Sequence, residues 1–195
     1  MIIKKMAVGN TDEAFIEKDF STGVNIISSD DNNKGKTIVI QSIMYAMGNE
    51  PVFPHSFEYD NYYHYVEFEH ENIIYRICRY NSSFVLAYNS VIMIFDNVSE
   101  LKRYWTKYIF PFPQIHKNQI LKIVDPVLFF QLFFVGQDKK DTSNIANAGL
   151  YNKQDFYNMI YDICNAGGLS LNDEEIKTII NGVKFKNKIG VCLDS

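Results

Sequence analysis

The chain has 195 residues, of which 47% are hydrophobic and 22% charged, a composition typical of one globular domain with a sizeable core. A formal net charge of −4 excludes a global basic field of the kind that attracts nucleic acid. Three widely spaced cysteines indicate neither a disulfide framework nor a metal site, and there is no secretory leader or membrane-spanning apolar run, so we expect a cytoplasmic location.

The first quarter of the chain predicts short strands and turns followed by one helix. The expected elements are strands at 2–8, 14–16 and 24–29 and a helix at 36–47. Apolar residues recur at helical spacing along that helix, and Gly48 is placed to end it.

In the middle of the chain, apolar and polar residues alternate with a period of two. Residues 62–95 predict an antiparallel meander of three or four strands. A helix at 98–109 with Ser99 as its N-cap is expected next. The remaining expected elements are a short helix or strand at 117–124, an apolar strand at 127–134 and helices at 153–164 and 172–181.

The polar loop before the first helix ends in Gly-Lys-Thr, as a phosphate-binding loop does. Such a loop wraps phosphate oxygens with backbone N–H groups at a helix N-terminus. Those groups would come from Asn32, Asn33, Lys34, Gly35, Lys36 and Thr37. Asp30 stands where the pattern has its first glycine, which weakens the match without breaking it, because Asp tolerates positive φ better than most residues.

The side chains of this loop predict a nucleoside triphosphate, ATP, with Mg²⁺. Lys36 would place its ammonium on the β- and γ-phosphates, and the Thr37 hydroxyl would complete the magnesium shell. Asp30 and Asp31 would repel phosphate, so their side chains must point outward. The alternative is a polar surface turn before a helix that begins with Gly-Lys-Thr by chance.

Three further segments occur in a characteristic order along the chain: Gly23-Val24-Asn25-Ile26-Ile27, Tyr45-Ala46-Met47-Gly48 and Tyr75-Arg76-Ile77-Cys78-Arg79. With the loop, they resemble the N-terminal half of an ABC-type ATPase head of the SMC and double-strand-break-repair class, which includes SMC-like ATPases of bacterial phage-defence systems. The resemblance runs from residue 1 to about 140. It implies an α/β fold, namely a P-loop NTPase head lobe with a mixed β-sheet, a small antiparallel meander and flanking helices.

The same resemblance assigns a Q-loop glutamine, which reaches the magnesium ion and the attacking water. Gln137 in Phe133-Phe134-Val135-Gly136-Gln137-Asp138 matches that position, so the implied metal ligands are Thr37 and Gln137. A surface glutamine in a loop is the alternative.

Other parts of such a head are missing from the chain. No Leu-Ser-Gly-Gly motif occurs, and Ser195 stands where the glutamate of a Walker B strand ending at Asp194 would be. We therefore assign no catalytic residue and expect the chain alone to bind ATP with negligible turnover. The resemblance implies that the C-terminal half of the head or a second head, as in a homodimer, completes the site and that the complete assembly acts on DNA.

On this interpretation residues 1–145 form the ATPase lobe, and 146–195 form a helical extension towards a missing arm or second lobe. Two other functions remain open. A small P-loop kinase or phosphotransferase would need an acceptor pocket and a lid arginine, and a degenerate interaction module would account for Asp30 and the missing glutamate. The sequence also leaves open whether Arg76 and Arg79 approach a nucleotide or a partner head, or are ordinary surface charges.

Overall fold

A computed structural model describes residues 1–30, 35–117, 120–133 and 153–164. Its main feature is a six-stranded sheet in the order β2-β1-β3-β4-β5-β6, in which all neighbours are antiparallel. The strands are β1 (Ile2–Gly9), β2 (Ala14–Glu17), β3 (Tyr63–His70), β4 (Ile73–Tyr80), β5 (Ser83–Tyr88) and β6 (Val91–Phe95). The α/β class is therefore confirmed, but the expected mixed sheet is not found within these residues, because the meander joins the N-terminal hairpin in one antiparallel sheet.

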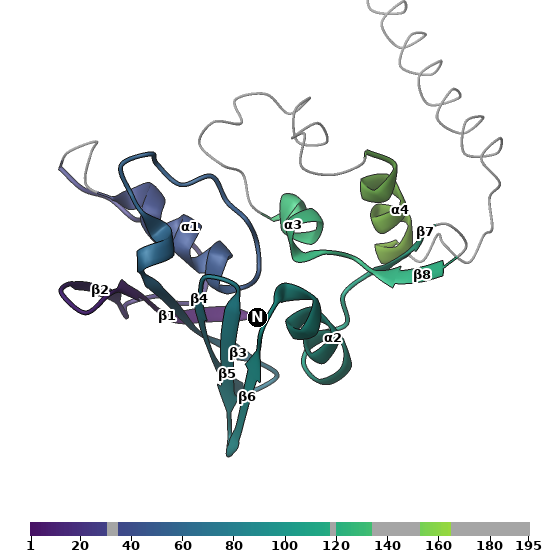
Figure 1. The fold of residues 1–195 in the computed structure, drawn as a ribbon, viewed down its shortest axis with the longest axis horizontal. Coiled ribbons are helices and arrows are strands. Elements are labelled where there is room, and N and C mark those ends of the chain that lie inside the picture. The colour runs from purple at the N-terminus through teal and green to yellow at the C-terminus, as the bar shows by residue number, and fades with distance from the viewer. Residues whose placement is uncertain (31–34, 118–119, 134–152, 165–195) are drawn as a thin grey trace, which may run out of the picture.

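Helices and a small hairpin surround one side of this sheet (Figure 1). They are α1 (Lys36–Ala46), η1 (Tyr59–Asn61), α2 (Val98–Tyr108), the hairpin β7 (Gln114–Lys117) and β8 (Ile120–Ile123), α3 (Pro126–Phe129), η2 (Phe130–Leu132) and α4 (Lys153–Ile163). No helix among them is both long and apolar enough to cross a bilayer. The expected helices at 36–47, 98–109 and 153–164 are confirmed to within a few residues.

The meander has four strands because its turns contain residues that tolerate a left-handed backbone. Glu71, Asn72, Asn81 and Asn89 all have positive φ, between 48° and 63°. Asparagine adopts this region at lower cost than most residues, so the tight turns between β3 and β6 form without glycine. The period of two then places alternate side chains on the core face.

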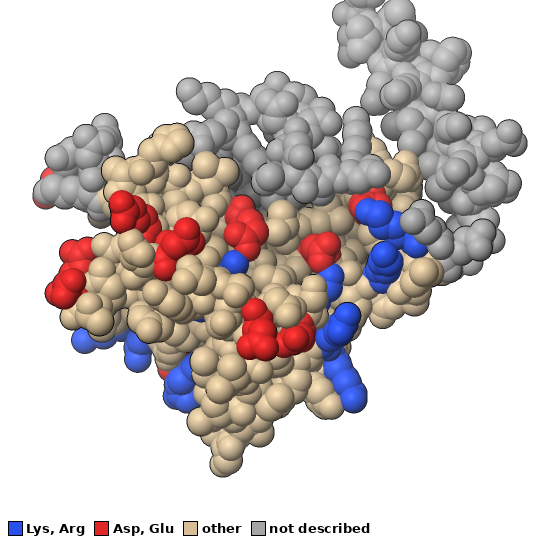
Figure 2. All heavy atoms as spheres, viewed as in Figure 1, with Lys and Arg blue, Asp and Glu red and all other residues tan. Residues whose placement is uncertain are grey.

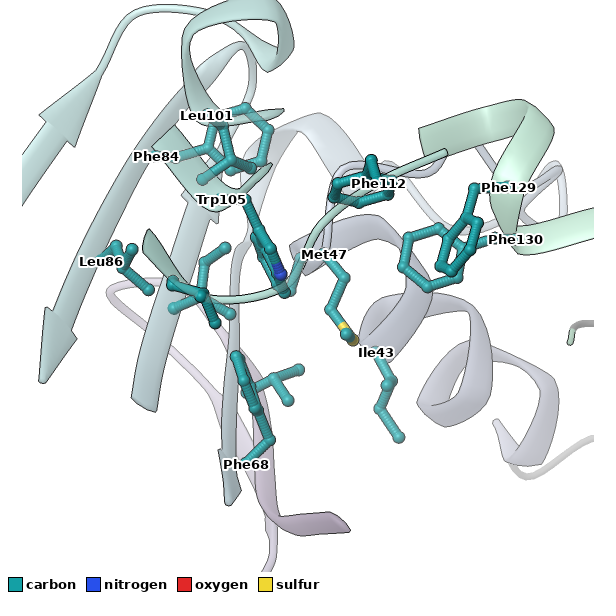
Figure 3. Close-up of a cluster of buried hydrophobic side chains, with 14 of the residues drawn as sticks. Ile43, Met47, Phe68, Phe84, Leu86, Leu101, Trp105, Phe112, Phe129 and Phe130 are labelled. Atoms are coloured by element: carbon teal, nitrogen blue, oxygen red, sulfur yellow. The ribbon is translucent and has the colours of Figure 1, made fainter. Parts of the chain in front are cut away.

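The core lies between the inner face of the sheet and helices α1 and α2 (Figure 3). Phe68, Phe84 and Leu86 are fully buried on the sheet side. Met47 at the end of α1 and Trp105 on α2 pack into the same cluster, and the Trp105 ring stacks on Phe68 with centroids 5.5 Å apart. This packing fixes α1 across the sheet and so determines where its first residue lies.

Three local expectations were wrong. Residues 24–29 form no strand, because β2 and β3 already occupy both edges of β1 and no other strand of the described part lies beside them. Asn97, not Ser99, caps α2, and its side chain accepts from the Glu100 N–H at 3.0 Å.

The third wrong expectation concerns the apolar strand at 127–134. The residues of this range that the structure describes form α3 and η2 instead. Pro126 supplies the fixed φ and the missing N–H that suit the first position of a helix, so the chain turns into a helix there. The 117–124 segment, where a helix or strand was expected, contributes to the β7–β8 hairpin.

Two side-chain contacts hold α4 against β7. Asp162 accepts a hydrogen bond from the Gln114 N–H at 2.9 Å, and Lys117 pairs with Asp155 at 2.7 Å. Phe156 and Met159 of α4 are buried in the main core. The expected helix at 172–181 and the boundary at 145/146 lie outside the described residues.

Candidate nucleotide-binding site

The candidate site begins where the polar loop enters α1. Gly35 occupies the N-cap position with φ 74° and ψ 6°, a left-handed conformation that L side chains rarely adopt. A Cβ at this position would meet no atom within 4 Å, so the glycine is required for its backbone angle and not for space. Among the described residues no side chain caps the helix, and its first turn holds no acidic residue to offset the positive end of the helix dipole.

Lys36 is the first residue of α1, and its side chain turns back across the loop. Its ammonium donates to the Ser29 hydroxyl, with Nζ and Oγ 2.5 Å apart. This contact joins the residues on either side of segment 31–34. Thr37 follows in the first turn of the same helix. Sequence reasoning did not single out Ser29, because a serine seven residues before a lysine carries no distinguishing pattern.

The remaining predicted ligands cannot be placed. Asn32, Asn33, Lys34 and Gln137 lie outside the described residues, as do the Walker B-like segment at 189–194 and residue Asp31. Asp30 is exposed. Within the part of the chain that the structure describes, no three His, Cys, Asp or Glu side chains gather as a metal site would require.

Arg79 binds the opposite, C-terminal end of α1. Its side chain extends from β4 and is only 4% exposed. Its Nη1 donates to the Tyr45 carbonyl at 3.0 Å and to the Asn49 carbonyl at 2.9 Å. Its Nε donates to the Asn81 carbonyl at 2.8 Å, and its Nη2 pairs with Glu50. The guanidinium also lies 3.6 Å from the centroid of the Tyr45 ring.

These contacts decide the role of Arg79. The eleven residues of α1 rise about 16 Å, so Arg79 lies far from the loop and holds the C-terminal turn of the helix. Arg76, three residues earlier on the same strand, is on the other face of the sheet, where it donates to Glu67 at 2.8 Å. Neither arginine is near the start of α1.

Burial near the C-terminal end of α1 shifts the pKa values of Tyr45 and His64. Desolvation raises the pKa of Tyr45 to about 12, while the Arg79 charge opposes the shift. Desolvation also lowers the pKa of His64, which is fully buried with its Nε2 3.1 Å from the Tyr59 carbonyl. Both groups are therefore neutral at pH 7 and serve packing, with ring centroids 4.8 Å apart.

A hollow of about 570 Å³ runs beside the irregular segment 20–27 and the flank of α1. Ile3, Phe20, Ile27 and Ile40 are among the residues that line it. In the same stretch Val24 is 89% exposed and Ile26 is 85% exposed. Among the described residues this segment has no strand partner, so Val24 and Ile26 form an exposed apolar surface of the kind that often marks an interaction site.

Comparison with known proteins gives one similarity of note. No protein-family model matches the chain. Over 194 residues the chain is 26% identical to the Lamassu protein LmuB of Bacillus cereus (strain VD014), a match that covers 96% of this chain and 32% of LmuB. The chain therefore spans about a third of the length of this relative.

Proposed function

We propose that this chain is the N-terminal, ATP-binding lobe of an SMC-like ABC ATPase head that acts in antiviral defence. The observation that carries the proposal is the entry into α1, where a left-handed Gly35 precedes Lys36 and the lysine ammonium bridges the loop to Ser29. The similarity to LmuB along nearly the whole chain supports the defence context and a larger complete protein.

The proposed chemistry follows from that geometry. Backbone N–H groups at the start of α1 would hold phosphate oxygens, and Lys36 would exchange its contact with Ser29 for the β- and γ-phosphates. Thr37 would coordinate Mg²⁺ together with Gln137, which would also reach the attacking water.

Hydrolysis requires groups that this chain does not supply. In this proposal they come from the C-terminal half of the head and from an opposing head, so that ATP between two heads drives dimerisation and the assembly acts on DNA. The exposed Val24 and Ile26 beside the 570 Å³ hollow give the C-terminal half a place to add strands to the 24–29 segment.

Isothermal titration of ATP and Mg²⁺ into the chain tests the site. We expect measurable binding by the wild type, and a loss of about tenfold or more for Lys36→Ala, because a charge-assisted phosphate contact is removed. Lys107→Ala is the matched control, since Lys107 is an exposed lysine of α2 and should bind as the wild type does. Equal affinities for Lys36→Ala and the wild type would remove the basis of the proposal.

A further inference from the structure

The β5–β6 hairpin is an uncharged projection of the sheet. Residues 83–95 contain no Asp, Glu, Lys or Arg, and Figure 2 shows the corresponding tip without charged side chains. β6 is the last strand of the sheet (Figure 1). Natural edge strands are normally protected by charges, proline or bulges. β6 has none of these, since its sequence is Val-Ile-Met-Ile-Phe and its pairing with β5 is regular.

The register shows which groups β6 presents. A two-residue turn joins Tyr88 to Val91, and such a closing pair exchanges backbone hydrogen bonds. The bonded pairs then alternate along the hairpin, so Val91, Met93 and Phe95 bond to β5. Ile92 and Ile94 therefore direct their N–H and C=O groups to the free edge. Both side chains are 70% exposed on the outer face of the sheet.

The helices that the structure describes leave this edge open. Tyr104 of α2 contacts the Tyr88 hydroxyl at 2.7 Å and the Phe95 ring at 5.3 Å, and both of these residues point to the inner face. The outer face next to β6 carries Val85 and Ala87, which pair with Ile94 and Ile92. Val85 is 42% exposed, so the apolar surface continues from the edge strand onto β5.

We propose that β6 pairs with β6 of a second copy of this chain, antiparallel, about a two-fold axis through Met93. This register sets Ile92 opposite Ile94 of the second copy and Val91 opposite Phe95. Both isoleucines present outward N–H and C=O groups, so each Ile92–Ile94 pair exchanges two backbone hydrogen bonds. The four isoleucines then form one apolar cluster on the outer face of a continuous sheet.

Charge and polarity select both the occupant and the register. At the ends of the paired strands Ser90 lies opposite Asp96 of the second copy, so no like charges meet. A register centred on Ile94 would place Ile92 against that Asp96, and one centred on Ile92 would place Ile94 against Ser90. Only the arrangement centred on Met93 pairs every apolar residue of β6 with an apolar residue. The interface is isologous, as a closed dimer requires.

This dimer does not depend on the proposed nucleotide site, so it is tested without ATP. Sedimentation equilibrium of the 195-residue chain should show a concentration-dependent dimer. Ile92→Lys and Ile94→Lys should each raise the dimer Kd by about tenfold or more, because each change acts twice across the axis and charges a pairing edge. Ile16→Lys is the matched control: Ile16 is 61% exposed on β2, the other edge strand, and its substitution should leave the Kd unchanged.

Cross-linking tests the register. Met93→Cys places two thiols on the axis in a non-bonded pair, whose Cα atoms lie about 4.5 Å apart, within the range of a disulfide. Mild oxidation should therefore cross-link Met93→Cys well above the wild type, which retains its native cysteines, and above Ile16→Cys. A monomeric wild type at all soluble concentrations, or a dimer that Ile94→Lys leaves intact, would overturn the proposal.

Discussion

The two ends of α1 differ in nearly every physical respect. At its start a glycine and a lysine border a polar loop, with no side-chain cap and no acidic residue in the first turn. At its end a buried arginine binds the carbonyls of Tyr45 and Asn49, and aromatic rings surround the last turn. One end is fastened by these contacts, and the other carries the loop that we propose to bind phosphate. A helix that holds a phosphate needs both, because a mobile helix would lose binding energy to the cost of ordering.

The largest effect on stability is expected at the fastened end. Arg79→Met should lower the free energy of unfolding by about 3 kcal/mol, because it leaves several buried carbonyls without a donor. Urea denaturation measures the change. Arg76→Met on the same strand is the control, and should cost at most about 1 kcal/mol, because its ion pair with Glu67 is partly exposed. Similar losses for both variants would contradict the asymmetry of α1.

An intermediate effect on stability is expected at the N-terminal end of α1. Gly35→Ala should cost about 1–2 kcal/mol, since the Cβ opposes a φ of 74° although no atom crowds it. Gly35→Asn should recover part of this loss, because asparagine tolerates the left-handed region. The two variants are compared by urea denaturation. If alanine and asparagine cost the same, the left-handed angle is not what the glycine provides.

The smallest effect is a pH dependence at the fastened end. The pKa of His64 is lowered by burial, so protons bind its unfolded form more tightly than its folded form. The contribution of neutral His64 is complete above the unfolded value of about 6.5 and decreases as the pH falls below it. His64→Phe, which keeps an aromatic ring beside Tyr45, should reduce the slope of stability against pH in that range.

Much of the local structure could be predicted from periodicity and turn residues. The hairpin, the meander and three helices follow from patterns within each segment, as in Tyr63–His70, where alternate residues are buried. The wrong predictions concern segments whose structure is not set by the pattern of apolar residues alone. Residues 24–29 have the composition of a strand, yet a strand requires a neighbour to bond, and none is available among the described residues. The apolar run after Asp125 became helical because of Pro126.

The sequence by itself determined the position of the polar loop before α1, because Gly-Lys-Thr and the helical spacing after it are local properties. Only the tertiary structure decided that Lys36 reaches Ser29, that Arg79 binds the C-terminal end of α1 and that β6 is the last strand of the described sheet. Each of these depends on which segments lie side by side after the core has packed. Contacts between residues distant in the chain follow from that packing and not from any local pattern.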